Sequence, residues 1–273
     1  MLAGLTLFQF YPVVVAAVQS FQSFNPFTGA TEGFDGLANY QALFSDPAFL
    51  AALRNTIIYI ALTIAVEIPL ALFLAQLINS RLPASGLLRI TVIATLAASE
   101  TVAVLVWNRL YDPTHGLFNS VLHLVGIGAQ PFLISSVQAL PSIVVMAAWK
   151  NVGLAVLIFL AGLQNVPPDL HEAASLDGAG PWRRFRSITW PFLRRYAVVS
   201  LFVSTVAATR VFTPVMLMTQ GGPENGTTNL TYYTYQQAFQ FSQYGVADAA
   251  TVCLIAILSV VTLIQALALR DRE

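Results

Sequence analysis

The chain has 273 residues, of which 56% are hydrophobic and 10% are charged. Ordinary soluble domains carry about 25% charged residues, so this composition and a mean hydropathy of +0.69 predict a polytopic membrane protein. The formal net charge is zero, which gives no electrostatic reason to expect a nucleic-acid partner. The single cysteine, Cys253, lies in an apolar run and is best interpreted as a small packing residue.

Six stretches are apolar and long enough to cross about 30 Å of hydrocarbon, which takes around 20 helical residues. They lie near residues 2–21, 55–78, 90–108, 137–163, 197–218 and 247–269. The first stretch lacks a basic leader and a small-residue cleavage site, so we expect it to remain as a span. The sequence therefore predicts an all-α polytopic membrane protein with six transmembrane helices.

We expect one domain over residues 1–273, with outer loops at about 22–54, 109–136 and 219–246. Residues 36–49 suggest a short interfacial helix before the second span. Pro69, Pro141 and Pro214 fall inside the second, fourth and fifth predicted spans, where we expect them to kink the helices and free backbone carbonyls.

Basic residues are distributed unevenly among the loops. Nine of the thirteen follow the second, fourth and sixth spans, namely Arg81, Arg89, Arg183, Arg184, Arg186, Arg194, Arg195, Arg270 and Arg272. The remaining loops are richer in acidic residues. By the positive-inside rule, both termini and the loop at about 164–195 are predicted to be cytoplasmic.

The longest polar island follows the fourth span and has the pattern of two short helices. Asp169 can cap the first helix, with Glu172 three residues later as in a capping box. Gly178 and Gly180 supply the break, Pro181 suits the first turn of a second helix, and Pro191 is expected to end it. Spacing alone also allows a basic amphipathic segment lying on the membrane surface.

This island also resembles the coupling-loop motif of permease subunits in bacterial ATP-binding-cassette importers. The residues in register with that motif are Glu172, Ala173, Ala174, Gly178, Ile188 and Pro191. The longer version found in sugar importers is matched by Leu176, Asp177, Gly178, Ala179 and Phe185. A proline common shortly after the motif is replaced by Arg194-Arg195, which leaves the exit angle of the loop open.

A second stretch is similar to the same family. Residues 219–223, Thr-Gln-Gly-Gly-Pro, read as a tight turn by their chemistry, and the turn itself is placed at Gly221, Gly222 and Pro223. They also resemble the Thr-X-Gly-Gly-Pro run of the family's outer loop between its last two spans, and residues 235–239 match its Tyr-X-X-Ala-Phe pattern. The resemblance covers the chain from about residue 36 to the end.

The resemblance implies the first of two non-identical permeases of a binding-protein-dependent sugar or glycerol-phosphate importer. It implies a short cytoplasmic coupling helix between spans four and five, in a bacterial inner membrane. The partners it implies are a second homologous permease, two cassette ATPases and an extracytoplasmic solute-binding protein. The implied solute is a sugar, oligosaccharide, polyol or glycerophosphodiester.

The sequence offers no pattern for ATP binding or for catalysis by this chain itself. The only lysine, Lys150, lies outside any phosphate-binding loop, so ATP and Mg are assigned to partner ATPases and no cofactor or metal is expected here. The alternative is an intramembrane enzyme acting on a lipid or lipid-linked substrate. It would need a nucleophile with a base, a metal cluster or paired acids, and no such pattern is present, so we expect no catalytic residues.

Four ionisable residues fall within the predicted spans, namely Glu67, Glu100, Lys150 and Arg210. Each costs about 2.5–3.5 kcal/mol in lipid and therefore faces a bundle interior or a watery path. Pairing of Lys150 with Glu100 and a solute path both remain open. The residues we place on the solute path are Glu100, Asn108, Lys150, Asn151, Arg210 and Phe212.

Overall fold

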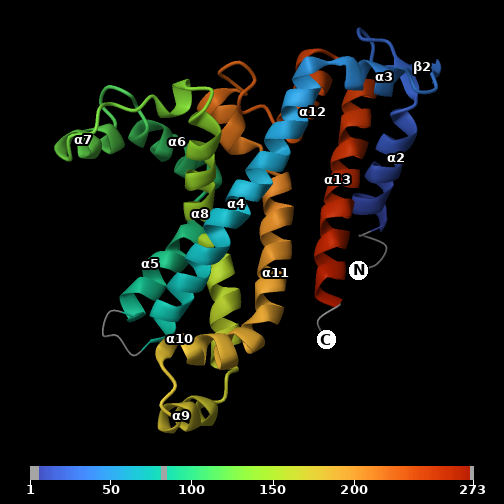
Figure 1. Ribbon diagram of the computed structural model, residues 1–273. Coiled ribbons are helices and arrows are strands. Elements are labelled where there is room, and N and C mark those ends of the chain that lie inside the picture. Colours follow the sequence, from blue (N-terminus) through green and yellow to red (C-terminus); the bar gives the residue numbers. More distant parts are fainter. Residues whose placement is uncertain (1–5, 81–84, 271–273) are drawn as a thin grey trace.

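The computed structural model describes residues 6–80 and 85–270, and it is mostly helical. Its elements up to residue 80 are η1 (Thr6–Phe10), α2 (Tyr11–Gln19), β1 (Gln22–Phe24), β2 (Thr31–Phe34), α3 (Ala38–Ser45) and α4 (Pro47–Asn79). The strands β1 and β2 form one antiparallel hairpin. The short helix expected before the second span is confirmed as α3 (Figure 1).

The elements after residue 84 are α5 (Ser85–Ala97), α6 (Glu100–Leu110), α7 (Leu117–Leu124), η2 (Phe132–Ile134), α8 (Ala139–Gln164), α9 (Pro168–Leu176), α10 (Pro181–Arg184), η3 (Phe185–Thr189), α11 (Trp190–Thr209), η4 (Val215–Thr219), α12 (Leu230–Tyr235), η5 (Gln236–Gln240) and α13 (Tyr244–Arg270). The elements η1, η3, η4 and η5 are single π-helical turns.

Four helical segments in the described part of the chain are long and apolar enough to cross a membrane. They are α4, α8, residues 181–209 and residues 244–267. The pair α5 and α6 together gives a fifth candidate, and its two helices are bent by 107°. The predicted first span corresponds to η1 and α2, and its residues 2–5 lie outside the described residues.

The long helix α4 packs along α8, and α11 contacts both (Figure 1). One apolar cluster joins α4, α8 and α11 near α9, with Ala75, Phe159 and Leu193 fully buried. A second cluster joins α4, α6, α8 and η4. A third links α3 and α4 to α12 and α13 through Phe49 and Tyr233. These clusters hold the helices around the polar residues described below.

The third predicted span, residues 90–108, is not one straight helix. The helix α5 ends at Ala97 and α6 begins at Glu100, because Ser99 takes an extended conformation with φ −61° and ψ 135°. The Ser99 side chain makes no capping hydrogen bond, and the Glu100 carboxylate in the first turn suits the positive end of α6. As a result α6 turns sideways and carries α7 away from the bundle (Figure 1).

Two of the three prolines do not interrupt helices as expected. Pro141 lies in the first turn of α8, where its missing N–H leaves no intrahelical bond unmade. The helix α11 ends at Thr209, before Pro214, because proline cannot donate to the carbonyl four residues earlier and its ring clashes there. Pro69 alone of the three lies in a helix interior, that of α4.

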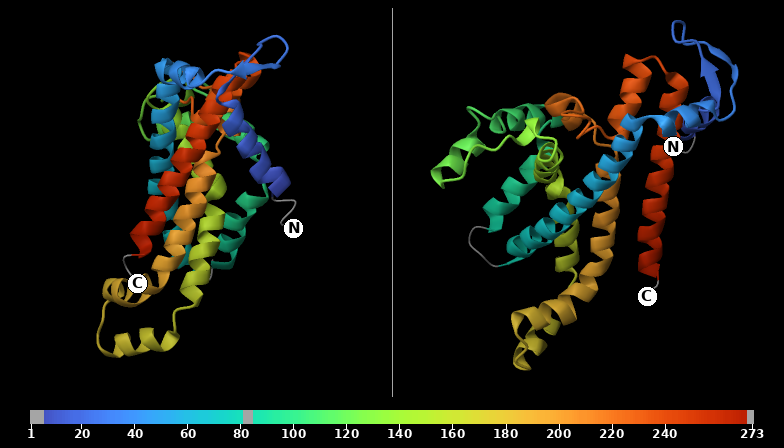
Figure 2. Two further views of the ribbon diagram at one scale, coloured as in Figure 1. Left: turned by 90° about the vertical axis from the view of Figure 1, so that its right-hand side faces the viewer. Right: turned by 45° about the horizontal axis from the view of Figure 1, so that its top comes forward.

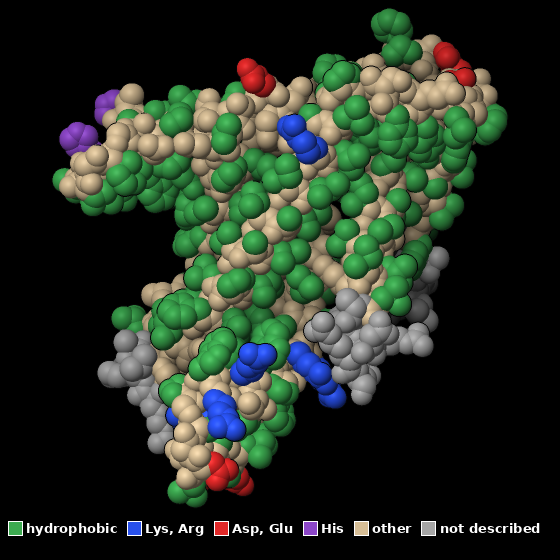
Figure 3. All heavy atoms as spheres, viewed as in Figure 1, with side chains coloured by type: hydrophobic (Ala, Val, Ile, Leu, Met, Phe, Trp, Pro, Cys, Tyr) green, Lys and Arg blue, Asp and Glu red, His purple; other side chains and the backbone are tan. Residues whose placement is uncertain are grey.

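The two ends of the bundle differ in charge. The elements α10, η3 and α11 place Arg183, Arg184, Arg186, Arg194 and Arg195 at the end that carries α9 (Figure 3). Both views in Figure 2 show α9 and α10 beyond the ends of the long helices. Two further residues assigned to that side, Arg81 and Arg272, lie outside the described residues.

Candidate functional site

The segment after α8 forms a helix, a reversal and a second helix. At the reversal, Gly178 takes the left-handed conformation with φ +72°, which glycine adopts without strain. Its N–H donates to the Ser175 carbonyl at 3.1 Å, and the Ala179 N–H donates to the Ala174 carbonyl at 2.9 Å. These two bonds are the Schellman pattern that ends a helix, so Gly178 fixes where α9 stops.

Two details predicted for this segment are wrong. Asp169 does not cap α9, since the helix begins at Pro168 and Asp169 lies in its first turn. Pro191 does not end the second helix, because α10, η3 and α11 run as one helical segment over residues 181–209. The π-helical turn η3 lies just before Pro191 and changes the hydrogen-bond pattern there, which accommodates the missing N–H.

The residues of this segment divide into exposed and anchored groups. Leu176 is 90% exposed and Trp182 is 71% exposed, and Glu172 and Asp177 also face outward. Phe185 instead packs against the apolar cluster of α4, α8 and α11, with its ring stacked on Trp182 at 5.7 Å between centroids. The segment thus presents exposed apolar, acidic and basic side chains on a fixed base.

A cavity of about 320 Å³ lies between α4, α6, α8 and α11. Four residues predicted for a solute path line it, namely Glu100, Lys150, Asn151 and Arg210. The other polar residues in its wall are Tyr59, Thr63, Glu67 and Ser204. The fold therefore gathers residues from four helices, far apart in sequence, at one place in the bundle.

The charged groups of this cavity are not paired with one another. Glu67 is 3% exposed and accepts a hydrogen bond from the Ser204 hydroxyl at 2.9 Å. The Lys150 ammonium donates to the Leu96 carbonyl at 3.4 Å, in the last turn of α5, where carbonyls lack helical partners. Among the residues described, no salt bridge joins Glu100 to Lys150, so the pairing alternative is not seen.

Residues 219–246 fold back against the bundle. Gly221 has φ +81°, and a Cβ there would overlap the Thr228 hydroxyl. The Gly222 N–H donates to the Thr219 carbonyl at 2.9 Å, which closes a tight turn at the predicted position. The Tyr233 hydroxyl donates to Asp46 at 2.6 Å. Burial, reinforced by this bond, raises the pKa of Tyr233 above its ordinary value.

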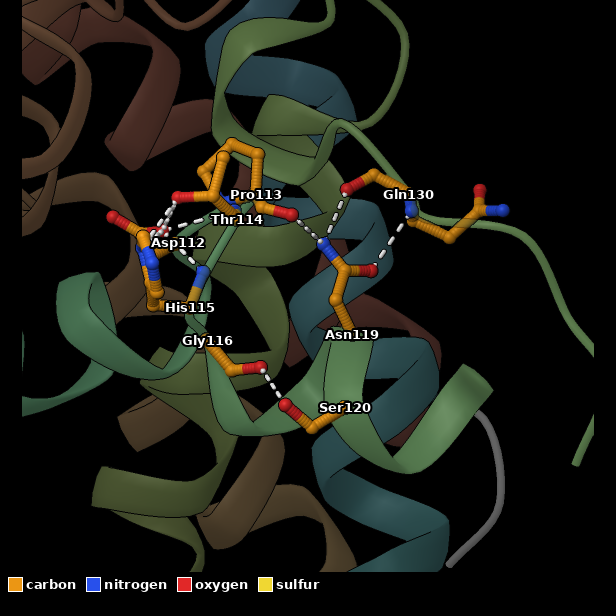
Figure 4. Close-up of polar contacts among 8 residues, drawn as sticks. All are labelled: Asp112, Pro113, Thr114, His115, Gly116, Asn119, Ser120 and Gln130. Atoms are coloured by element: carbon orange, nitrogen blue, oxygen red, sulfur yellow. Dashed lines mark hydrogen bonds and ion pairs between the residues drawn. The ribbon is translucent and has the colours of Figure 1, made fainter. Parts of the chain in front are cut away.

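The sideways arm that begins with α6 is braced by a polar turn (Figure 4). Asp112 accepts bonds from the backbone N–H of Thr114 at 2.9 Å and of His115 at 2.8 Å. These donors, led by His115, hold the pKa of Asp112 down to about 2. The Asn119 side chain forms hydrogen bonds with Pro113 and Gln130 at 2.8–3.1 Å, which connect α7 to the irregular segment before η2.

Residues 48–272 match the family model described as binding-protein-dependent transport system inner membrane component. The chain belongs to this family. The family predicted from the two motifs is thereby confirmed, and the protein is a membrane permease of such a transport system.

Curated relatives agree with the family. The trehalose/maltose transport system permease protein MalF of Thermococcus litoralis is 33% identical over 219 residues, which cover 80% of this chain and 74% of that protein. The sn-glycerol-3-phosphate transport system permease protein UgpA of Agrobacterium fabrum is 35% identical over 260 residues, covering 95% of this chain and 88% of that protein.

A solved structure shows the same fold. It is that of a bacterial alginate transporter in complex with an alginate pentasaccharide-bound periplasmic protein. The match covers 100% of this permease and 92% of that chain, with a TM-score of 0.85 at 21% identity. At this identity the likeness concerns the fold.

Two residues that we predicted for the solute path lie elsewhere in the permease. The Asn108 amide donates to the Leu217 carbonyl at 3.4 Å and borders a separate hollow of about 1060 Å³ between α6 and η4. Phe212 packs on Tyr232 and Tyr235, with ring centroids 6.2 and 5.1 Å apart. The bend before Glu100 turns Asn108 away from the cavity.

Four polar residues of the cavity wall were not predicted for the solute path, namely Tyr59, Thr63, Glu67 and Ser204, although Glu67 was recognised as an ionisable residue within a span. Tyr59, Thr63 and Glu67 are spaced by four residues, so they lie on one face of α4. Polar residues that recur every four positions in an otherwise apolar span are the sequence signal that could have identified these three. Within the described residues, no group of three His, Cys, Asp or Glu side chains could hold a metal ion.

Proposed function

We propose that this permease passes a carbohydrate-type solute across the bacterial inner membrane as one subunit of an ATP-driven importer. The observation that carries the proposal is the polar cavity among α4, α6, α8 and α11. It offers carboxylates that accept hydrogen bonds and an ammonium, a guanidinium and an amide that donate them. The hydroxyl groups of a solute both donate and accept hydrogen bonds, so sugars, oligosaccharides, polyols and glycerophosphodiesters suit the polar residues of this wall. The names of the MalF and UgpA relatives support this class.

Two partner ATPases, using ATP and Mg, are proposed to drive the transport. The exposed face around Glu172, Ala173, Leu176 and Asp177 would seat in an ATPase, with Phe185 as its anchor. Residues 181–209 form one helical segment whose far end carries Ser204 into the cavity wall. At 1.5 Å per residue it spans about 40 Å, so a movement of α9 and α10 would shift the cavity wall.

A second homologous permease is proposed to cover the open side of the cavity. Glu100 and Arg210 line the cavity but are exposed in this chain alone. Facing lipid, each charge would cost about 2.5–3.5 kcal/mol. A partner helix over this side would remove that cost. An extracytoplasmic binding protein is the expected donor of solute, by analogy with the periplasmic protein in the alginate complex.

The proposed orientation places both termini and the α9–α10 end in the cytoplasm. The arginines of α10, η3 and α11 support it by the positive-inside rule. In a Cys253→Ala background, single cysteines at Ser187 and Gly222 should react from opposite sides of the membrane. Labelling of both by an impermeant reagent added to intact cells contradicts this orientation.

Transport by the assembled importer tests the cavity. Lys150→Met, Asn151→Ala and Arg210→Met should each lower uptake at least about tenfold at matched membrane abundance, because each removes donors to the solute. Val260→Ala, on the exposed face of α13, is the control and should transport normally. Normal uptake by all three variants contradicts the cavity assignment, and failure only through lost assembly supports a structural role. Turnover of a lipid by the chain alone would favour an enzyme instead.

A further inference from the structure

The helix α11 stops inside the protein, and its last carbonyls need donors. A membrane-embedded helix end has no water to satisfy these groups. The Ala207 carbonyl accepts from the Arg210 N–H at 3.2 Å, and the Val206 carbonyl accepts from the Thr209 hydroxyl at 2.9 Å. The carbonyls of Thr209 and Val211 are satisfied from a distant part of the chain.

Two side chains at the start of α12 supply these donors. The Thr231 hydroxyl donates to the Thr209 carbonyl at 3.0 Å, and the Asn229 amide donates to the Val211 carbonyl at 2.7 Å. The oxygen of the same amide accepts from the Tyr232 N–H at 2.8 Å, which caps α12. Asn229 is 3% exposed. One buried amide therefore joins the end of α11 to the beginning of α12.

The helix α4 holds the same stretch from its other side. The Asn55 amide donates to the carbonyls of Asn225 and Thr228, at 2.7 and 2.9 Å. The Leu230 N–H donates to the Thr56 hydroxyl at 2.9 Å. We call residues 225–231 the clamped segment, because they are bonded to α4 on one side and to α11 on the other.

The clamped segment fixes the backbone on both sides of Arg210. Thr209 and Val211 are its direct neighbours, and Arg210 itself lines the cavity. We propose that Asn229 and Thr231 are positioning residues that hold the Arg210 guanidinium at the solute site and pass displacements of the outer loop to it. This inference rests on the proposed function of the cavity.

Variants at Asn229 and Thr231 can separate the effects of their hydrogen bonds to the Val211 and Thr209 carbonyls. Asn229→Asp keeps an acceptor for the Tyr232 N–H and loses the donor to Val211, while Thr231→Val removes only the hydroxyl. Thr231→Ser restores that hydroxyl. Thr251→Val is the control, because Thr251 bonds only the Ala247 carbonyl within α13, at 2.9 Å.

In the assembled importer, Asn229→Asp and Thr231→Val should raise the half-saturating solute concentration about fivefold to tenfold, with maximal ATP hydrolysis retained. Thr231→Ser and Thr251→Val should behave as the parent. The shifts should vanish in an Arg210→Met background, since the group being positioned is gone. If Asn229→Asp fails to assemble, the comparison of Thr231→Val with Thr231→Ser tests the positioning role.

Other outcomes distinguish the two proposals. Equal shifts with and without Arg210 overturn the positioning role and leave the cavity proposal standing. An unchanged half-saturating concentration in both variants also overturns it. Normal transport by Arg210→Met overturns the cavity assignment of that residue and, with it, this inference.

Discussion

The α9–α10 segment and the clamped segment, which follows the Thr-Gln-Gly-Gly-Pro turn, differ in how their polar groups are used. In the α9–α10 segment, Glu172 and Asp177 make no side-chain hydrogen bond to any other described residue, and Leu176 stands 90% exposed. In the clamped segment, Thr228 and Asn229 are 1% and 3% exposed and donate to the carbonyls of Gly221 and Val211, which lie outside this segment.

This difference indicates what each sequence pattern contributes to the chain. Buried polar groups are nearly always bonded within a protein, so a pattern satisfied internally serves the chain's own fold. An exposed pattern with an apolar ridge and no internal partners serves another protein. We therefore propose the α9–α10 segment as the surface for an ATPase, whereas the polar groups of the clamped segment serve contacts within the chain.

The largest effect is expected where the exposed segment loses its shape. Gly178→Leu places a side chain at φ +72°, which costs about 1–3 kcal/mol and reorients α9 relative to α10. We expect the variant to reach the membrane and to lose solute-stimulated ATP hydrolysis or its coupling to uptake. Both rates can be measured in proteoliposomes containing the full importer.

Gly180→Leu is the matched control for size. Neither glycine has a heavy atom within 4 Å of an added Cβ, but Gly180 has φ −65°, which any residue adopts. This control should retain most activity. Normal transport by Gly178→Leu would falsify the assignment of α9 as the docking segment.

A smaller effect, on stability, is expected in the buried segment. Asn55→Ala removes the two hydrogen bonds that this amide donates, leaving the carbonyls of Asn225 and Thr228 without that donor, and also the 3.4 Å bond that its oxygen accepts from Arg54. We expect the free energy of unfolding to fall by about 2 kcal/mol, measured by thermal unfolding in detergent. Asn165→Ala is the control, because this exposed amide also makes two bonds, to Ala161 and Tyr196. An equal loss of unfolding free energy in both variants contradicts the view that buried polar bonds stabilise the fold more than exposed ones.

Much of the framework could be predicted because hydropathy and spacing report local physics. The apolar runs located α4, α8 and α13, and Gly178 located the reversal after α9. The residues Glu100, Lys150, Asn151 and Arg210 came together as predicted for the path, since intramembrane charges must face inward. Whether solute follows this path stays a prediction.

The rest depended on tertiary contacts that no local pattern carries. The run from residue 90 to 108 is apolar on both sides of Ser99, so hydropathy could not reveal the 107° bend. That bend moved Asn108 away from the cavity. The early end of α11 needs donors from Asn229 and Thr231, which lie some twenty residues further along the chain.

The smallest effect is expected at the Asp112 turn, which is exposed like the α9–α10 segment but bonded internally like the clamped one. Its carboxylate accepts three bonds within residues 112–115, and these hold its pKa at about 2. The folded pKa lies below the unfolded value of about 3.9. The turn is therefore stabilised by the charged carboxylate at pH above about 4 and loses this contribution as the pH falls toward 2.

Asp112→Asn removes the charge and keeps an oxygen that can accept the backbone bonds. In thermal unfolding, the melting temperature of the parent permease should exceed that of this variant by a small margin. The margin should be constant from pH 7 to pH 5 and should narrow below about pH 4, because only then does the unfolded-state carboxyl begin to protonate. A margin that already disappears between pH 7 and pH 5 contradicts this assignment, because the carboxyl stays charged in both states over that range. If no margin is seen at any pH, the bonds of the Asp112 carboxylate add nothing measurable to stability. Burial, and not internal bonding, then separates the clamped segment from the α9–α10 segment.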